Sequence, residues 1–364
     1  MKVFLIVGVR PHFIKSSLLI KELEKYFEVI LIHTGQHYDY NMSEAFFKEL
    51  NIRKPDYAIK VVNKNSNEKL FMMSLEISKI INKENPDCII VIGDSNTPLA
   101  GALAGKLSHI PIAHIEAGVR NYNVNMEEEI NRTIIDKIAT IFFTPTEECV
   151  VNLKKESINN DVYFVGDLLL EVINRNIEKL ELMPDVLKKL DLRSKEYVLL
   201  TIHRKENTNN IKNVLSIINN LDKTKGKIVF PVHPRVKKLM MESCEYKNLL
   251  KINSLKIIDP VNHENMISLL KNAKYVITDS NGIQRESYFV KTPCIIARDS
   301  TEVKETLENR CSILTENRLE ILHQAIDYYE SMPSIEYNTK KFGDGDSSVK
   351  IAKILHEYLS NSRI

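Results

Sequence analysis

The chain has 364 residues, 43% of them hydrophobic and 27% charged, a composition and length typical of a globular protein with two domains. Fifty basic and 48 acidic residues leave a formal net charge of +2, so no strong basic field indicates nucleic acid as a partner. The five cysteines form no C-x-x-C pair, and no apolar stretch approaches the ~18 residues that span a bilayer; we therefore expect a cytoplasmic enzyme with no membrane partner and no zinc site.

Short, continuous apolar runs predict the strands of a first sheet at 2–7, 29–33, 88–92, 112–114 and 141–144. Between them, apolar residues at helical spacing predict helices at 14–24, 43–50, 70–82 and 127–138. Continuous hydrophobicity is typical of strands that are covered on both faces, which favours parallel sheet with crossover helices.

A second series of strands is predicted at 197–201, 227–231, 255–258, 275–278 and 294–298, with helices at 211–221 and 264–271. The charged stretch 174–195 separates the two series and predicts the domain junction. A helix predicted at 347–359 follows the second series and packs back on the first domain. The sequence thus predicts an α/β protein with two Rossmann-like, doubly wound domains that face a shared cleft: 1–175 joined by 347–364, and 176–346.

Two glycine patterns resemble nucleotide motifs but do not fit them. Arg10 stands where the dinucleotide fingerprint G-x-G-x-x-G has its second glycine. The run from Gly101 to Lys106 is one residue short of a phosphate loop, lacks the following Ser or Thr, and lies in a helical pattern. We therefore expect neither a dinucleotide cofactor nor ATP hydrolysis.

Ionisable side chains follow nearly every predicted strand, at its carboxyl end. In the first domain they are Arg10 and Lys15, Thr34-Gly35-Gln36-His37, Gly93-Asp94-Ser95-Asn96-Thr97, His114-Ile115-Glu116 and Glu127-Glu128-Glu129-Ile130-Asn131-Arg132. In the second domain they are His203-Arg204-Lys205-Glu206-Asn207, His233-Pro234-Arg235, Asp279-Ser280-Asn281-Gly282-Ile283-Gln284-Arg285-Glu286 and Arg298. Ligands usually bind at this edge of open α/β sheets.

Each of these residues taken singly also has a structural explanation. Asp94 and Ser280 suit helix caps, the glutamates at 127–129 suit the start of a helix, and His203 suits a surface position. Together they place carboxylates in the first domain and a Ser-Asn-Gly helix start, which suits phosphate, in the second. Carboxylate acid–base groups combined with a diphosphate site indicate an enzyme that acts on a nucleotide sugar.

From Gly8 to about Leu355, the sequence resembles the non-hydrolysing UDP-N-acetylglucosamine 2-epimerase family. The motifs that carry the resemblance are Gly8-Val9-Arg10-Pro11, Gly93-Asp94-Ser95-Asn96-Thr97, His114-Ile115-Glu116-Ala117-Gly118, Glu128-Glu129-Ile130-Asn131-Arg132, His203-Arg204-Lys205-Glu206-Asn207, Thr278-Asp279-Ser280-Asn281-Gly282-Ile283-Gln284 and Phe342-Gly343-Asp344-Gly345. The resemblance implies a GT-B fold, a homodimer, no cofactor or metal, and a place in the synthesis of surface polysaccharide precursors. It also implies the reaction: UDP is eliminated across C1–C2 to give a 2-acetamidoglucal and adds back on the other face.

The resemblance implies roles for particular residues as well. Asp94, Glu116 and Glu128 are the implied acid–base carboxylates, and His203 is the fourth implied catalytic residue. His203, Arg10 and Lys15 contact the diphosphate or leaving group by this reasoning. Ser280 and Gly282 hold phosphate, and Glu286 holds the ribose. Further substrate contacts are implied for Gln36, His37, Arg132, Arg204, His233, Met266, Asn281 and Arg298.

Some positions depart from the family pattern and leave the hexosamine open. His12 replaces an acidic residue, Asn281 replaces the first glycine of Ser-Gly-Gly, and Val303-Lys304-Glu305 replaces Arg-Pro-Glu. The stretches 10–15 and 165–167 are similar to relatives that act on UDP-2,3-diacetamido-2,3-dideoxyglucuronate, whose extra carboxylate needs a cation such as His12 or Lys304. A hydrolysing 2-epimerase, a GT-B glycosyltransferase and a non-catalytic UDP-sugar-binding regulator are the remaining alternatives.

Overall fold

The computed structural model describes residues 1–35, 47, 52–61, 65–180, 185–208, 211–221, 224–232, 234–243, 249 and 252–361. The predicted substrate-binding residues Gln36, His37 and His233, and nearly all of the helix predicted at 43–50, lie outside these ranges. The chain forms two compact units: unit 1 is Met1–Val172 with Lys340–Ile364, and unit 2 is Ile173–Thr339. The junctions predicted from the sequence, after residues 175 and 346, stand three and seven residues from these divisions.

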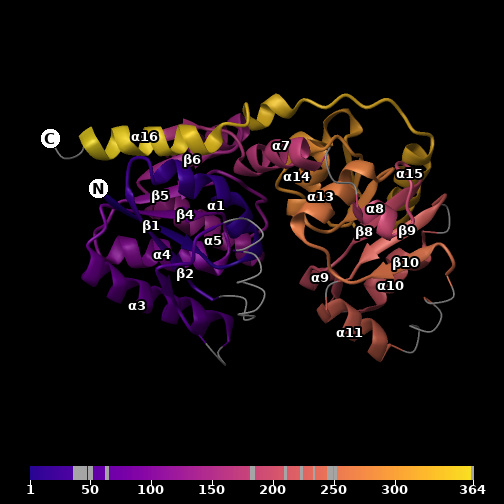
Figure 1. The fold of residues 1–364 in the computed structure, drawn as a ribbon, viewed down its shortest axis with the longest axis horizontal. Helices are drawn as coiled ribbons and strands as arrows, with labels where there is room; N and C mark the ends of the chain where they lie inside the picture. Colours follow the sequence, from indigo (N-terminus) through magenta and orange to yellow (C-terminus); the bar gives the residue numbers. More distant parts are fainter. Residues whose placement is uncertain are drawn as a thin grey trace. The chain divides into compact units, whose positions relative to one another are not determined.

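Unit 1 contains a seven-stranded parallel sheet in the order β3-β2-β1-β4-β5-β6-β7 (Figure 1). The strands are β1 (Lys2–Val7), β2 (Glu28–His33), β3 (Tyr57–Ala58), β4 (Cys88–Ile92), β5 (Ile112–Ile115), β6 (Ile141–Thr144) and β7 (Val162–Phe164). Its helices are α1 (Arg10–Leu23), α3 (Ser66–Glu84), α4 (Asn96–Leu107), α5 (Glu127–Ile138), α6 (Glu147–Lys155), α7 (Leu168–Leu180), which continues into unit 2, and α16 (Ser347–Asn361), preceded by the 3₁₀ helix η2 (Thr339–Phe342).

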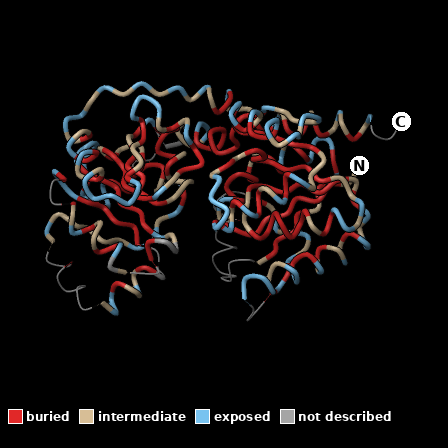
Figure 2. The backbone as a smooth tube through the Cα atoms, turned by 180° about the vertical axis from the view of Figure 1, so that it is seen from behind, coloured by how far each residue is buried: buried red, intermediate tan, exposed pale blue. Residues whose placement is uncertain are grey.

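The central strand β1 shows why both faces of this sheet are apolar. Val3, Leu5 and Val7 belong to a core shared with α1 and α16, whereas Phe4 and Ile6 belong to a core shared with α3 and α4. Figure 2 shows buried stretches of backbone inside each unit, and strands such as β4 are buried along their whole length. Because helices cover the sheet on both faces, the strands are continuously hydrophobic, as the sequence pattern predicts.

Helix α4 lies unusually close to the sheet, and two glycines permit this. A Cβ atom on Gly101 would stand 3.0 Å from side-chain carbons of Ile6 and Val91, and one on Gly105 would stand 2.9 Å from Ile89 Cδ1. The Gly101–Lys106 run is therefore a helix–sheet packing element, in agreement with its rejection as a phosphate loop.

Helix α16 returns from unit 2 and completes unit 1. Its apolar face, including Ile351 and Leu355, is buried in the same core as β1. The buried carboxylate of Glu171 on α7 accepts hydrogen bonds from the backbone N–H of Ser348 at 2.7 Å and from its hydroxyl at 2.6 Å. A carboxylate at a helix start satisfies exposed N–H donors and complements the helix dipole, so this contact anchors the returning helix.

Unit 2 contains a six-stranded parallel sheet in the order β10-β9-β8-β11-β12-β13. The strands are β8 (Tyr197–Thr201), β9 (Lys227–Pro231), β10 (Leu255–Ile258), β11 (Val276–Thr278), β12 (Cys294–Ile296) and β13 (Ser312–Leu314). The helices are α8 (Asp185–Lys189), α9 (Lys205–Thr208), α10 (Ile211–Asn219), α11 (Pro234–Glu242), α13 (His263–Asn272), α14 (Asn281–Phe289), α15 (Leu319–Glu330) and the 3₁₀ helix η1 (Lys304–Arg310). The predicted α/β class with two doubly wound parallel sheets is confirmed.

Three strands were not expected from the sequence: β3, β7 and β13. All three are two or three residues long and lie at sheet edges, where partial exposure removes the continuous apolar run. Among the described residues, no helix is long and apolar enough to cross a membrane.

Candidate active site

In unit 1, the carboxyl ends of the adjacent strands β4 and β5 bring two of the predicted carboxylates together. Asp94 follows β4 and Glu116 follows β5. A Cβ atom on Gly93 would stand 3.3 Å from Glu116 Oε2, so the Glu116 carboxylate lies against the residue that precedes Asp94. Glu116 has φ = +71°, a left-handed conformation that costs a non-glycine residue roughly 1–3 kcal/mol and is concentrated at functional sites.

Glu116 forms a buried ion pair with Lys15 of α1. The Lys15 ammonium lies 2.6 Å from Oε1 and 2.7 Å from Oε2, and both side chains are more than nine-tenths buried. A buried charge is stable only when it is paired, so each of these residues holds the other in place. The sequence interpretation assigned Lys15 to the diphosphate; in this structure its contact is the predicted catalytic carboxylate.

Asp94 is held by two residues of α5. Arg132 is buried and donates to Asp94 Oδ2 through Nε at 3.1 Å and through Nη2 as well, while its Nη1 donates to Glu129 at 2.9 Å. Asn131 donates to the backbone carbonyl of Asp94 at 3.0 Å. About a third of the Asp94 side chain stays exposed, so this carboxylate is oriented by α5 and still accessible.

Glu129 was missed as a site residue by the sequence interpretation. Besides pairing with Arg132, it accepts the backbone N–H groups of Asn121 and Tyr122, both at 2.8 Å. It therefore joins the loop after β5 to the helix that holds Asp94. Glu127 accepts from Asn96 at 2.8 Å and from Ser66 at 3.2 Å.

Glu128 differs from both neighbouring glutamates. Its side chain is half-buried, and it forms no hydrogen bond or ion pair with a described residue. It lies in the first turn of α5. Of the three glutamates, it is the one whose carboxylate can exchange a proton without first breaking a contact that the structure shows.

The turn between β1 and α1 carries Arg10 and His12. Arg10 is the first residue of α1 and is half-buried. His12 is buried, and its Nδ1 accepts the Gly8 N–H at 3.3 Å. The His12 ring is therefore committed to the fold of this turn.

In unit 2, the buried carboxylate of Asp279 organises the loop after β8. It accepts the backbone N–H groups of His203 at 3.1 Å and Arg204 at 3.0 Å, and the side-chain amide of Asn207 at 2.9 Å. The His203 side chain is 45% exposed and the Arg204 residue is half-buried. Asp279 thus presents His203 beside the start of α14, which is the next element after Asp279 itself.

The start of α14 combines the predicted residues Ser280, Asn281 and Gly282. Ser280 caps the helix, its hydroxyl accepting the Ile283 N–H at 3.4 Å. A Cβ atom on Gly282 would meet, among the described residues, only the Ser280 hydroxyl at 3.7 Å, so the backbone here is open to a ligand. The first N–H groups of a helix have no partner within it and bind anions.

Arg298 supports this helix start from the end of β12. Its guanidinium donates to Glu302 at 2.9 and 3.2 Å and to the Asn281 side chain, whose amide in turn donates to Glu302. Asn281, which replaces a family glycine, is therefore a structural link in this structure. The substrate contacts proposed for Asn281 and Arg298 stay predictions.

Glu286 lies one turn further along α14 and is buried beside His263 of α13. His263 Nε2 is 3.1 Å from Glu286 Oε1, and Met266 lies half-buried on the same helix. His263 was not singled out from the sequence, because its partner is 23 residues away and belongs to another helix.

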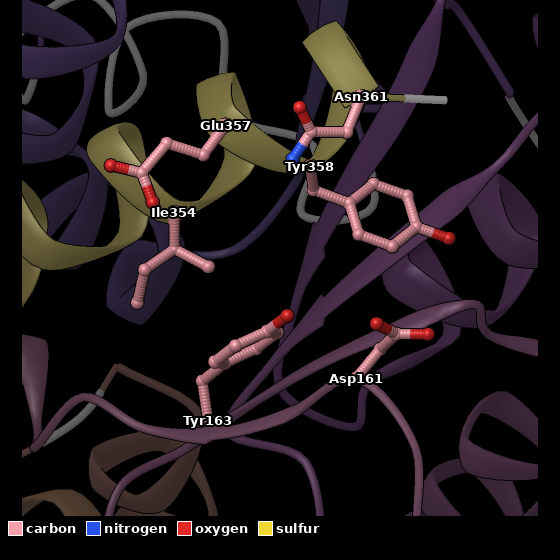
Figure 3. Close-up of a pocket in the computed structure, with 6 residues that line it drawn as sticks. All are labelled: Asp161, Tyr163, Ile354, Glu357, Tyr358 and Asn361. Atoms are coloured by element: carbon pink, nitrogen blue, oxygen red, sulfur yellow. The ribbon is translucent and has the colours of Figure 1, made fainter. Parts of the chain in front are cut away.

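The hollow on unit 1 shown in Figure 3 lies apart from these residues. It measures about 380 Å³ and is lined by Asp161, Tyr163, Ile354, Glu357, Tyr358 and Asn361. Asp161 precedes β7, so the hollow is at the amino end of that strand, whereas Asp94 and Glu116 follow carboxyl ends. Within the described ranges, no group of three or more His, Cys, Asp or Glu residues is arranged to hold a metal ion.

Known proteins match this chain over almost its whole length. Residues 21–356 match the sequence profile of the family described as UDP-N-acetylglucosamine 2-epimerase. A UDP-N-acetylglucosamine 2-epimerase homologue of Methanococcus maripaludis is 41% identical over 98% of this chain and 99% of its own length. The UDP-2,3-diacetamido-2,3-dideoxy-D-glucuronate 2-epimerase of Pseudomonas aeruginosa is 35% identical over 98% of this chain and 99% of its own length.

The structure of the Methanocaldococcus jannaschii UDP-GlcNAc 2-epimerase, in complex with UDP-GlcNAc and UDP, superimposes with a TM-score of 0.91. That protein is 37% identical, and the match covers 98% of this chain and 100% of the other. The fold and the matches define an isomerase of the nucleotide-sugar 2-epimerase class with a GT-B-like fold. The chain belongs to the non-hydrolysing UDP-N-acetylglucosamine 2-epimerase family.

Proposed function

We propose that this protein inverts C2 of UDP-N-acetylglucosamine to give UDP-N-acetylmannosamine. A base takes the C2 proton while the C1–O bond breaks, and UDP leaves with the bonding electron pair to give a 2-acetamidoglucal. UDP then adds back to C1 while an acid delivers a proton to the opposite face of C2. The hydrogen moves as a proton, so the reaction requires no redox cofactor.

The observation that carries the proposal is the meeting of Asp94 and Glu116 at the ends of β4 and β5. Inversion through a flat intermediate requires acid–base groups on both faces of C2. Asp94 is oriented but accessible, Glu116 is fixed by Lys15, and Glu128 is without a described partner. These three carboxylates are assigned to proton transfer and to stabilising positive charge at C1.

We assign UDP binding to unit 2. The open N–H groups at Ser280–Gly282 suit the diphosphate, and the Glu286 carboxylate suits the ribose hydroxyls. His203, held by its backbone on Asp279, is assigned to the departing diphosphate. The structure of the Methanocaldococcus jannaschii relative contains UDP-GlcNAc and UDP, which supports binding of a UDP-sugar by this chain.

The second candidate substrate is UDP-2,3-diacetamido-2,3-dideoxyglucuronate, on which the Pseudomonas aeruginosa relative acts. Its extra carboxylate requires a cation near the sugar. His12 is buried against Gly8 and does not suit this role, whereas Lys304 is exposed at the start of η1. Lys304 therefore remains the candidate cation for that substrate, and we favour UDP-N-acetylglucosamine because relatives named for it are 41% and 37% identical, against 35% for the Pseudomonas aeruginosa protein.

Purified protein supplied with each sugar separately, with products resolved by ion-exchange chromatography, tests this choice. We expect kcat/KM at least tenfold higher for UDP-N-acetylglucosamine than for the diacetamido-uronate. The opposite ratio would transfer the proposal to the uronate, and free N-acetylmannosamine as the first product would indicate a hydrolysing enzyme.

We further propose that the protein is a homodimer in surface polysaccharide precursor synthesis. Large apolar side chains are exposed on two helices of unit 1: Phe71, Met72 and Leu75 on α3, and Ile130 and Ile134 on α5. The starts of α3, α4 and α5 are joined by hydrogen bonds from Asn96 to Ser66 at 2.9 Å and to Glu127 at 2.8 Å. Grouped apolar exposure of this kind is typical of an association surface.

A further inference from the structure

A buried His–Asp pair lies beneath both turns that carry the proposed acid–base residues of unit 1. His114 on β5 and Asp136 on α5 are fully buried, with His114 Nδ1 2.6 Å from Asp136 Oδ1. The proposed reaction gives neither residue a role. Burying polar groups of this kind is costly unless they are paired and hydrogen-bonded, so the pair is expected to serve the fold or the site.

The hydrogen bonds of His114 join two elements of the fold. His114 Nε2 faces the carbonyl oxygen of Gly93 at 3.0 Å, and a carbonyl only accepts, so this nitrogen is the donor. Burial opposes ionisation of Asp136, but His114 and Arg120 together hold its pKa below the usual range. The His114 ring therefore joins the Gly93 carbonyl to the Asp136 carboxylate.

Each residue of the pair is hydrogen-bonded to one of the turns that carry Asp94 and Glu116. The His114 ring holds the Gly93 carbonyl, directly before Asp94. The Asp136 carboxylate accepts the Gly118 N–H at 3.1 Å, two residues after Glu116. Since Glu116 has a left-handed backbone, its turn needs such fixed contacts to persist.

Arg120, two residues after Gly118 in the same loop, completes the network. It lies 2.7 Å from Asp136 Oδ2 and donates to Glu156 at 2.7 and 2.9 Å. Glu156, at the end of α6, is bonded to neither Gly93 nor Gly118 in the contacts that the structure describes. It thus offers a control that alters the same network without altering the turns.

We propose that His114 and Asp136 are positioning residues for C2 epimerisation, which set the relative placement of Asp94 and Glu116 through the Gly93 carbonyl and the Gly118 amide. The inference rests on the proposed function. Displacing a reacting group by about an ångström costs on the order of 100-fold in rate, so the pair acts on kcat rather than on UDP binding.

The first test compares Asp136→Asn with Glu156→Gln. Each change removes one carboxylate charge from the Arg120 network, but only Asp136→Asn alters the hold on the two turns. We expect Asp136→Asn to lower kcat about 10- to 100-fold, with KM within threefold and the calorimetric Kd for UDP unchanged. Glu156→Gln keeps wild-type kcat within about threefold. Equal effects of the two changes on kcat would overturn the proposal.

A second pair of variants decides the question if Asp136→Asn does not fold. His114→Gln places an amide near the position of Nε2, and His114→Asn places one near Nδ1, while both remove the imidazole ring. We expect His114→Gln to retain at least fivefold more kcat than His114→Asn, because it restores the donor to Gly93. Equal kcat values at equal thermal stability, or the reverse order, would overturn the proposal.

This inference rests on the proposed function, and assays of the wild-type protein distinguish failure of the one from failure of the other. Wild-type protein that epimerises neither UDP-N-acetylglucosamine nor the diacetamido-uronate would contradict the proposed function itself. A wild type with normal turnover, accompanied by a fully active Asp136→Asn variant, would contradict the positioning role alone.

Discussion

Three consecutive glutamates open α5, and their surroundings differ although their chemistry is the same. Glu127 is bonded to Asn96 and Ser66, and Glu129 is bonded to Arg132 and two backbone amides, whereas Glu128 has no such bond to a described residue. The bonds of Glu127 and Glu129 tie α5 to neighbouring segments, whereas Glu128 has no described bond to break before it accepts or donates a proton. At the residue scale, this contrast separates a proposed acid–base group from its two neighbours.

Neighbouring substitutions test the contrast directly. We expect Glu128→Gln to lower kcat by about 10²- to 10⁴-fold, the usual range for loss of a general acid or base. Glu127→Gln retains an oxygen acceptor for Asn96 and is expected to stay within fivefold of wild type. Steady-state kinetics on both variants suffices; similar losses would remove Glu128 from the mechanism.

A substitution at Asp94 tests whether this carboxylate is needed for turnover but not for UDP binding. Asp94→Asn keeps an oxygen for Arg132 but cannot ionise, so we expect most turnover to be lost while UDP affinity stays within threefold, since UDP is assigned to unit 2. Calorimetric titration with UDP beside the kinetic assay measures both quantities. Wild-type rates in this variant would exclude Asp94 from proton transfer.

His33, at the end of β2, is expected to make the stability of the fold depend on pH. It is buried and stacked on Phe13 at 5.3 Å, and burial lowers its pKa from 6.5 to about 4. Between these values the unfolded chain binds the additional proton, so stability falls as pH drops from 6.5 towards 4, by about 3 kcal/mol in total.

Replacing His33 by Phe removes this proton and keeps a ring against Phe13. Urea unfolding at pH 7.5, 6, 5 and 4.5 should show a smaller loss of unfolding free energy in His33→Phe than in wild type. Identical pH profiles for the two proteins would show that His33 does not contribute.

At the scale of elements, α5 organises the candidate site of unit 1. It holds Asp94 through Asn131 and Arg132, holds the turn after Glu116 through Asp136, and carries Glu128. The helix itself was predicted at its observed bounds from apolar spacing. Its function as a scaffold follows only from contacts made across the fold.

The sequence predicts which residues belong to this site better than it predicts which of them bond to one another. Asp94 and Glu116 were found because they end continuous apolar strands, whose carboxyl ends meet at one sheet edge. The Lys15–Glu116 pair joins residues 101 positions apart, and the Arg132–Asp94 pair joins residues 38 apart. Such pairs depend on how helices pack on the sheet, which local periodicity does not specify.

Because α4 lies close to the sheet, we expect any side chain at position 105 to lower the free energy of unfolding. Gly105→Val would press its methyl groups on Ile89 and Ile112, and overpacking of this kind costs about 1–3 kcal/mol. Lys106→Val, at an exposed position on the same helix, measures the helix-propensity cost of valine alone, roughly 0.5 kcal/mol. Equal urea midpoints for the two variants would contradict the packing argument.

At the scale of the whole molecule, the exposed apolar side chains of α3 and α5 predict self-association. Phe71 is 66% exposed and Leu75 is 57% exposed, so neither contributes to the core of the single chain. Light scattering coupled to gel filtration should give twice the monomer mass for wild type. Leu75→Glu should shift this to the monomer mass with little change in thermal stability, whereas a dimeric Leu75→Glu variant would place the interface elsewhere.

In the proposed reaction, C2 is inverted by elimination and re-addition of UDP, and a proton NMR time course of the protein with UDP-N-acetylglucosamine in D₂O follows the C2 hydrogen itself. We predict growth of the UDP-manno epimer with deuterium at C2, because the acid on the opposite face of C2 carries a deuteron taken from the solvent. A manno product that keeps its original C2 hydrogen would contradict the elimination mechanism. Absence of any C2 epimer from either UDP-N-acetylglucosamine or the diacetamido-uronate would contradict the function.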